Sequence, residues 1–201
     1  MTPRSGEEEN EKTKEGTPKT PDNIEAKLLE ARTILVEGPV SDKLYHAVVA
    51  RMYYLEAKDP KANILVVINS PGGSADSGFG IYDVMKFLTC PITTLTAGLC
   101  ASAGVLIHLG GGKGHRFVLP NSRFLLHQPS TQMYGQASDM EISAKEILRM
   151  RKRFAAIVAQ EVGATQDKVE ADSNRDFWLS AEESVKYGLA DKVVATRAEI
   201  Q

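Results

Sequence analysis

The residue best suited to nucleophilic chemistry in this chain is Ser102, which lies within the run Gly98–Gly104 (GLCASAG). Small residues surround it and an apolar stretch precedes it, so the sequence places it at a turn from a strand into a helix. A hydroxyl at a helix start lies near the positive end of the helix dipole, which stabilises the negative charge formed when serine attacks a carbonyl. The alternative interpretation is that Ser102 only caps the helix, and the local sequence leaves both open.

A nucleophilic serine needs a general base, and the chain offers four histidines. His127 ends an apolar strand and precedes Gln-Pro, which places it at a strand end, where sites usually form. His108 follows Ser102 by six residues on the same expected helix, so at 100° per residue it points elsewhere. His46 is expected on the surface of an early helix and His115 in an exposed glycine-rich turn. His127 is therefore the candidate base.

Two further segments could complete a site for acyl chemistry. Asp172 and Asp176 are predicted to lie in a polar loop before Phe-Trp-Leu, and either could orient a histidine. Ser70–Gly73 (SPGG) follows a continuous apolar strand, and its glycines would let a backbone N–H approach a ligand closely. That is what an oxyanion hole requires, although a plain turn would have the same composition.

The glycine-rich run from Gly110 to Gly114 does not form a phosphate loop. Gly114 follows Lys113 where Ser or Thr belongs, and Ile107 stands at the position of the first glycine. No nucleotide site is expected. Cys90 and Cys100 have neither metal-ligand spacing nor a disulfide pattern, so no metal is expected. No cofactor is expected either.

The composition indicates one cytoplasmic domain. The chain has 201 residues, 42% of them hydrophobic and 25% charged, which suits one globular domain with a substantial core. A net charge of −2 gives no reason to expect nucleic acid or a membrane as partner, and no signal peptide or apolar span is evident. Residues 1–22 are polar and charged and are predicted to be disordered, so we expect the folded domain to be residues 23–201.

Strand-like and helix-like segments alternate along the folded part, which predicts an α/β fold with loops at the strand ends. The last expected helix is long and highly charged, and such helices usually project or pack against a partner. The expected strands are 32–37, 64–69, 92–96, 116–119 and 123–126, and the expected helices are 23–30, 41–57, 77–88, one beginning near 102, and 138–162.

These segments, in this order, resemble the proteolytic subunit of the ATP-dependent Clp protease. The likeness runs from about residue 27 to 194, and the Ser102–His127 and His127–Asp176 separations are those of the family. The motifs are INSPGG at 68–73, GLCASAG at 98–104, LPNSRFLLHQP at 119–129, GQASDMEISAKEIL at 135–148 and DSNRDFWLSAEESVKYGLAD at 172–191.

The resemblance implies a catalytic role for each matched position. Ser102 would be the nucleophile of a serine endopeptidase, His127 its general base, and Asp176 the carboxylate that orients the imidazole. The backbone N–H groups of Gly73 and Ala103 would form the oxyanion hole. The implied fold is the crotonase-like spiral of ββα units with a protruding handle helix.

The family also implies an assembly. Its members stack two seven-membered rings around a chamber, and an AAA+ unfoldase of the ClpX or ClpA/ClpC type feeds in unfolded polypeptide. The handle helix and the stretch 130–136, which is expected to form a strand, would join the two rings. Cys100, Ala103 and Thr131-Gln132 depart from the usual residues, and the polar segment 1–22 replaces an apolar segment that contacts the ATPase. These departures suggest a divergent relative, one that could form mixed rings with a second ClpP-type subunit.

Three other functions fit parts of the sequence. A structural ring subunit could carry the three residues out of alignment and be catalytically silent. A crotonase-type acyl-CoA enzyme shares the fold but needs no serine–histidine–aspartate set. A serine–lysine signal peptide peptidase would need a lysine base and usually a membrane anchor.

Overall fold

The computed structural model describes residues 24–129 and 134–200. The segment predicted to be disordered, residues 1–22, lies outside the described residues. So do Thr131-Gln132 and most of the stretch 130–136 that was expected to form a strand.

In the described ranges seven strands form one sheet, ordered β1-β2-β3-β4-β7 with β5 and β6 attached through β3. All neighbouring strands are parallel except β5 and β6, which are antiparallel. A parallel sheet is covered on its faces, and the continuous apolar run of β2 accordingly lies in the core. The strands are β1 (Thr33–Glu37), β2 (Ile64–Ser70), β3 (Ile92–Ala101), β4 (Arg116–Val118), β5 (Arg123–Leu126), β6 (Phe177–Ser180) and β7 (Lys192–Val193).

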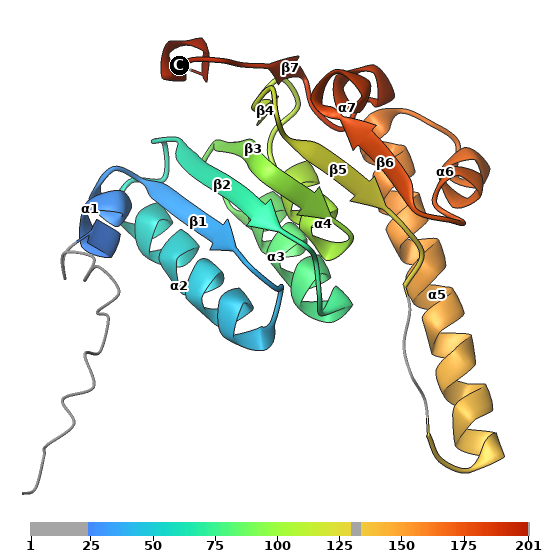
Figure 1. The fold of residues 1–201 in the computed structure, drawn as a ribbon. Helices are drawn as coiled ribbons and strands as arrows, with labels where there is room; N and C mark the ends of the chain where they lie inside the picture. The colour runs from blue at the N-terminus through green and yellow to red at the C-terminus, as the bar shows by residue number, and fades with distance from the viewer. Residues whose placement is uncertain (1–23, 130–133, 201) are drawn as a thin grey trace, which may run out of the picture.

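Helices follow most of the strands, and α2 and α3 lie side by side against one face of the sheet (Figure 1). The helices are α1 (Ile24–Glu30), α2 (Asp42–Lys58), α3 (Ala75–Phe87), α4 (Ala103–Leu109), α5 (Ala137–Val162), α6 (Gln166–Asp172) and α7 (Ala181–Tyr187), followed by the 3₁₀ turn η1 (Arg197–Ile200). Most of these bounds agree within two residues with the helices and strands predicted from the sequence.

The C-terminal half of the long helix α5 packs against the core, and its N-terminal half does not. Phe154 and Val158 in its C-terminal half are buried in the core, whereas Ile142 and Leu148 in its N-terminal half are exposed. Figure 1 shows this N-terminal half extending away from the sheet. The predicted projecting helix is therefore confirmed. Among the described helices, α5 included, none is long and apolar enough to cross a bilayer.

Strand β3 is longer than the sequence predicted, and its extra residues position the site. The predicted strand ended at Thr96, but the chain bends at Gly98 (φ +111°) and continues as a strand to Ala101. The Ser122 hydroxyl accepts a hydrogen bond from the Gly98 N–H (2.9 Å) and donates one to the Thr96 carbonyl (3.1 Å). After the bend β3 pairs with β5 instead of β4. This bend brings the end of β3 beside the end of β5.

Candidate active site

Ser102 occupies the single position between β3 and α4 and has a strained backbone. Its φ of +53° and ψ of −122° are unusual for a residue with a side chain. Its N–H donates to the Leu125 carbonyl of β5 (2.9 Å), which holds the turn in place. Ser102 is the N-cap residue of α4, and its carbonyl accepts from the Val105 N–H (2.9 Å), but its hydroxyl makes no capping hydrogen bond. Strain of this kind is found mainly where a side chain must be presented for function.

His127 and Asp176 are brought together by the antiparallel pair β5–β6. Leu126 pairs with Phe177, so the residue that follows β5 lies opposite the residue that precedes β6. His127 Nδ1 and Asp176 Oδ1 are 3.8 Å apart, which is near contact but longer than a hydrogen bond. The Asp176 side chain is 65% exposed. Within the described part of the chain, no hydrogen bond joins the Ser102 hydroxyl to the His127 ring.

Asp172 does not lie in a loop, contrary to the prediction. It is the last residue of α6, and its carboxylate accepts hydrogen bonds from Lys168 Nζ (2.5 Å) and Tyr187 Oη (2.9 Å). Partial burial opposes the charged form, yet these two donors hold the pKa of Asp172 below its ordinary value. Asp172 is therefore paired with Lys168 and Tyr187, and the carboxylate that lies beside His127 is that of Asp176.

The loop after β2 packs directly against Ser102. A Cβ on Gly72 would lie 2.6 Å from Ser102 Cβ and 2.7 Å from the Ala101 carbonyl, so only glycine fits. Val40 holds this loop from the other side: its N–H donates to the Gly72 carbonyl and its carbonyl accepts from the Ser74 N–H, both at 2.8 Å. The loop backbone is therefore fixed next to the hydroxyl.

Two backbone N–H groups border the space beside Ser102. Ala103 is the first residue of α4, where helical N–H groups have no partner within the helix. The second N–H belongs to Gly73. The N–H of the preceding residue, Gly72, is already engaged, because it donates to the Ser70 hydroxyl at 3.1 Å. The position that a Gly72 Cβ would take lies 3.1 Å from Ala103 N, so the two segments are in close contact. Gly73, Ser102 and Ala103 line the same groove.

The other three histidines and Cys100 are poorly suited to the chemistry of this site. His46 and His115 are exposed, as predicted. His108 is fully buried, with Nδ1 3.0 Å from the Thr96 hydroxyl. The Cys100 thiol, two residues before Ser102, is also fully buried, and burial raises its pKa to about 12. His127 is therefore the histidine at the site, and Ser102 is its nucleophile candidate.

Ser102 and His127 line one groove of about 710 Å³. Its walls come from the loop after β2 and from the three helices α3, α4 and α5, and they are largely apolar. Phe79, Leu106, Ile147, Met150 and Phe154 line it. A groove of this size is large enough to bind a ligand with apolar groups.

His108 should make stability depend on pH. Burial first, and then the nearby Arg116 charge, lower the pKa of His108 to about 3 from 6.5. As pH falls below 6.5 the unfolded chain takes up a proton that the native chain does not, so the free energy of unfolding decreases until about pH 3. We expect a loss of about 2 kcal/mol between pH 7.5 and 5 from this residue.

Urea unfolding at pH 7.5 and pH 5 measures this effect. His108→Gln, which stays neutral, should reduce the difference between the two pH values by about 2 kcal/mol. The matched control is the exposed His46→Gln, which should leave the difference as it is in the parent chain. An equal pH dependence in the parent and in His108→Gln would contradict the assignment.

The α/β fold thus places a strained serine at a strand–helix turn and a histidine in the same groove. The model of the Clp protease family matches residues 16–197. The structure is also similar to that of a ClpP1 mutant from Listeria monocytogenes, with a TM-score of 0.82 and 35% sequence identity over 88% of this chain and 98% of that one. The chain belongs to the Clp protease family, and its fold is the crotonase-like fold of ClpP.

Proposed function

We propose that the chain is an active serine endopeptidase and the proteolytic subunit of an ATP-dependent Clp protease. The observation that carries the proposal is Ser102, held at a strained φ of +53° with a hydroxyl that makes no capping bond, in one groove with His127. Membership of the Clp protease family supports it independently.

In the proposed mechanism each residue has one task. The Ser102 oxygen bonds to the scissile carbonyl carbon while His127 Nε2 takes the hydroxyl proton, and Asp176 stabilises the imidazolium from Nδ1. The N–H groups of Gly73 and Ala103 donate to the oxyanion. The carbon–nitrogen bond then breaks and His127 protonates the leaving amine. Water attacks the acyl-serine by the same route and restores the free hydroxyl.

Assembly is part of the proposal. His127 and Asp176 are 3.8 Å apart and Asp176 is largely exposed, and we propose that contacts with neighbouring copies position Asp176 within hydrogen-bond distance of His127. The projecting half of α5 exposes the apolar side chains of Ile142 and Leu148, which contact with other copies would cover. We propose two stacked heptameric rings, a tetradecamer, that degrade unfolded polypeptides in the cytoplasm as part of protein quality control.

The proposed partners are an AAA+ unfoldase, unfolded polypeptide and, as one form of the assembly, a second ClpP-type subunit in mixed rings. The second candidate function is a structural subunit that is silent until a partner aligns the triad. The observation that favours this second function is the 3.8 Å separation of His127 and Asp176 in the single chain, which is too long for a hydrogen bond.

Separating the purified chain by size and assaying each fraction tests the two candidates. We expect a particle of about fourteen chains that hydrolyses fluorogenic peptides, and single chains at least about a hundredfold slower because their triad is not aligned. Asp176→Asn should assemble normally and lower turnover by about 10⁴-fold. An assembled particle without activity, which gains it on addition of a second ClpP-type subunit, would establish the structural alternative.

A further inference from the structure

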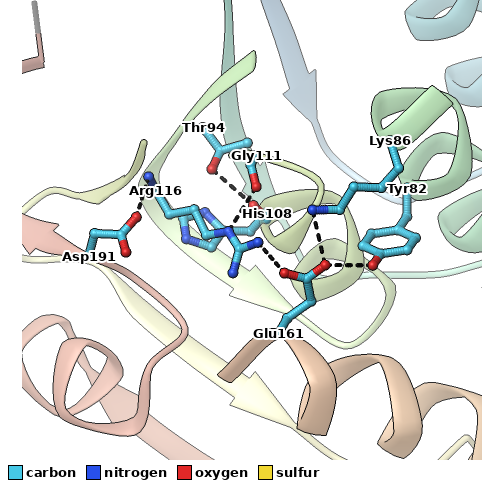
Figure 2. Close-up of polar contacts among 8 residues, drawn as sticks. All are labelled: Tyr82, Lys86, Thr94, His108, Gly111, Arg116, Glu161 and Asp191. Carbon is cyan, nitrogen blue, oxygen red and sulfur yellow. Dashed lines mark hydrogen bonds and ion pairs between the residues drawn. The ribbon is translucent and has the colours of Figure 1, made fainter. Parts of the chain in front are cut away.

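A buried carboxylate on α5 links three parts of the core. Glu161 accepts hydrogen bonds from Tyr82 Oη (2.7 Å) and Lys86 Nζ (3.0 Å) of α3 and forms an ion pair with Arg116 of β4. Figure 2 shows the Glu161 side chain pointing between these three groups. We call Glu161, Arg116, Lys86 and Tyr82 the Glu161 network.

The buried negative charge of Glu161 is balanced by the hydrogen-bond donors around it. Burial alone would raise the pKa of Glu161, but hydrogen bonds from Tyr82, Arg116 and Lys86 outweigh it and the pKa lies below its ordinary value. The Arg116 side chain is 2% exposed and the Glu161 side chain 6%. Breaking such a pair on one side leaves an uncompensated buried charge. The carboxylate is therefore strongly held in this place.

Arg116 extends the network to α4. Its Nε donates to the carbonyl of Gly111 (2.9 Å), just after the end of α4. Close packing holds the same turn, since a Cβ on Gly111 would lie 2.6 Å from Thr94 Oγ1. Thr94 Oγ1 in turn donates to the His108 carbonyl (2.9 Å). The end of α4 away from Ser102 is thus connected through Arg116 to Glu161.

The three helices joined in this way are the three that form the groove beside Ser102. On α3 the groove residue Phe79 lies one turn before Tyr82 and two turns before Lys86. On α5 the groove residue Phe154 lies two turns before Glu161. The network therefore fixes each helix within about two turns of the residues that line the groove.

We propose that Glu161 is a positioning residue that sets the spacing of α3, α4 and α5, and so the fit of the apolar side chain of a peptide in the groove. The inference rests on the proposed function of Ser102, because it concerns the groove beside that residue. Glu161 touches neither Ser102 nor His127 in the structure, so it acts on peptide binding more than on the reactivity of the serine.

The test compares full-length variants by two readouts. The first is the rate of labelling by a small fluorophosphonate, which needs only an aligned nucleophile and base. The second is the Kd of a fluorescein-labelled ten-residue peptide rich in leucine and phenylalanine, measured by anisotropy in a Ser102→Ala background. Because the Kd needs no catalysis, absence of labelling in the parent would count against the proposed function alone.

Glu161→Gln should raise the peptide Kd about tenfold and leave the labelling rate within about threefold of the parent. The matched control is Asp83→Asn, which removes the Asp83–Arg153 ion pair (3.4 Å) between the same two helices at the surface. Both readouts should stay unchanged in this control, since exposed pairs contribute little.

A double variant separates positioning from stability. Arg116→Met with Glu161→Leu removes both buried charges, so its thermal midpoint should lie close to that of the parent. Its peptide Kd should remain raised about tenfold, because α4 and α5 are no longer joined. Recovery of the parent Kd together with the midpoint would overturn the proposal. So would a Glu161→Gln variant that loses labelling and peptide binding by the same factor, or that loses neither.

Discussion

Replacing Ser102 with alanine is expected to lower peptide hydrolysis by the assembled protein by about 10⁴-fold or more, because no other group can form the acyl intermediate. The fold should survive, since the hydroxyl makes no capping hydrogen bond. Alanine tolerates the positive φ no worse than serine does. Hydrolysis of a fluorogenic peptide by the particle, at equal native mass for both proteins, measures the effect.

The matched control is Cys100→Ala, two residues away in the same motif. The Cys100 thiol is fully buried and its pKa is raised to about 12, so it supplies no thiolate at neutral pH. This variant should retain activity within about threefold of the parent. If Ser102→Ala kept measurable turnover and Cys100→Ala lost it, the assignment of the nucleophile would be wrong.

Gly72→Ala is expected to lower both stability and reactivity, although Gly72 carries no side chain of its own. The added Cβ would lie 2.6 Å from Ser102 Cβ and 2.7 Å from the Ala101 carbonyl, and the φ of +87° disfavours any side chain. The loop and the Ser102 turn must then move apart. We expect a loss of about 2–4 kcal/mol in the free energy of unfolding and a roughly hundredfold slower fluorophosphonate labelling.

Gly114→Ala is the matched control for backbone strain. Its φ of +83° is nearly the same, but a Cβ there meets no atom within 4 Å. It should cost only about 1 kcal/mol and leave labelling unchanged. Equal effects of the two substitutions on labelling would show that contact between the loop and Ser102 does not position the site.

The sequence was sufficient to predict the strands and helices around the serine because each has a strong local pattern. The apolar run of β2 shows where that strand begins and ends, and the N-cap Ser41 shows where α2 begins. The helix α5 begins within one residue of the prediction. The predicted end of β3 was wrong because a glycine such as Gly98 can either end a strand or bend it. A glycine after a strand usually ends it, but here Asn69 and Ser122 hold the bend and the strand continues.

The choice between Asp172 and Asp176 could not be made from local sequence. It depends on the pairing of β5 with β6, which joins segments about fifty residues apart, and on Tyr187, which engages Asp172. The elements from α6 to β7 are short, so no hydrophobic period predicts them. Only the resemblance to the family favoured Asp176.

The Glu161 network was not anticipated, although the sequence contains one signal for it. Glu161 falls on the same helix face as Phe154 and Val158, at the spacing of seven and three residues that predicts burial. A carboxylate in an apolar stripe requires buried partners. Those partners come from α3 and β4, so their identity depends on tertiary structure.

The central claim is that Ser102 is an activated nucleophile. Intact mass spectrometry of the assembled protein after incubation with a fluorophosphonate tests it most directly. One adduct per chain that is absent from Ser102→Ala is the predicted result, since only an aligned Ser102–His127 pair makes serine react at neutral pH. No adduct on the assembled particle, or an adduct that persists in Ser102→Ala, would contradict the account.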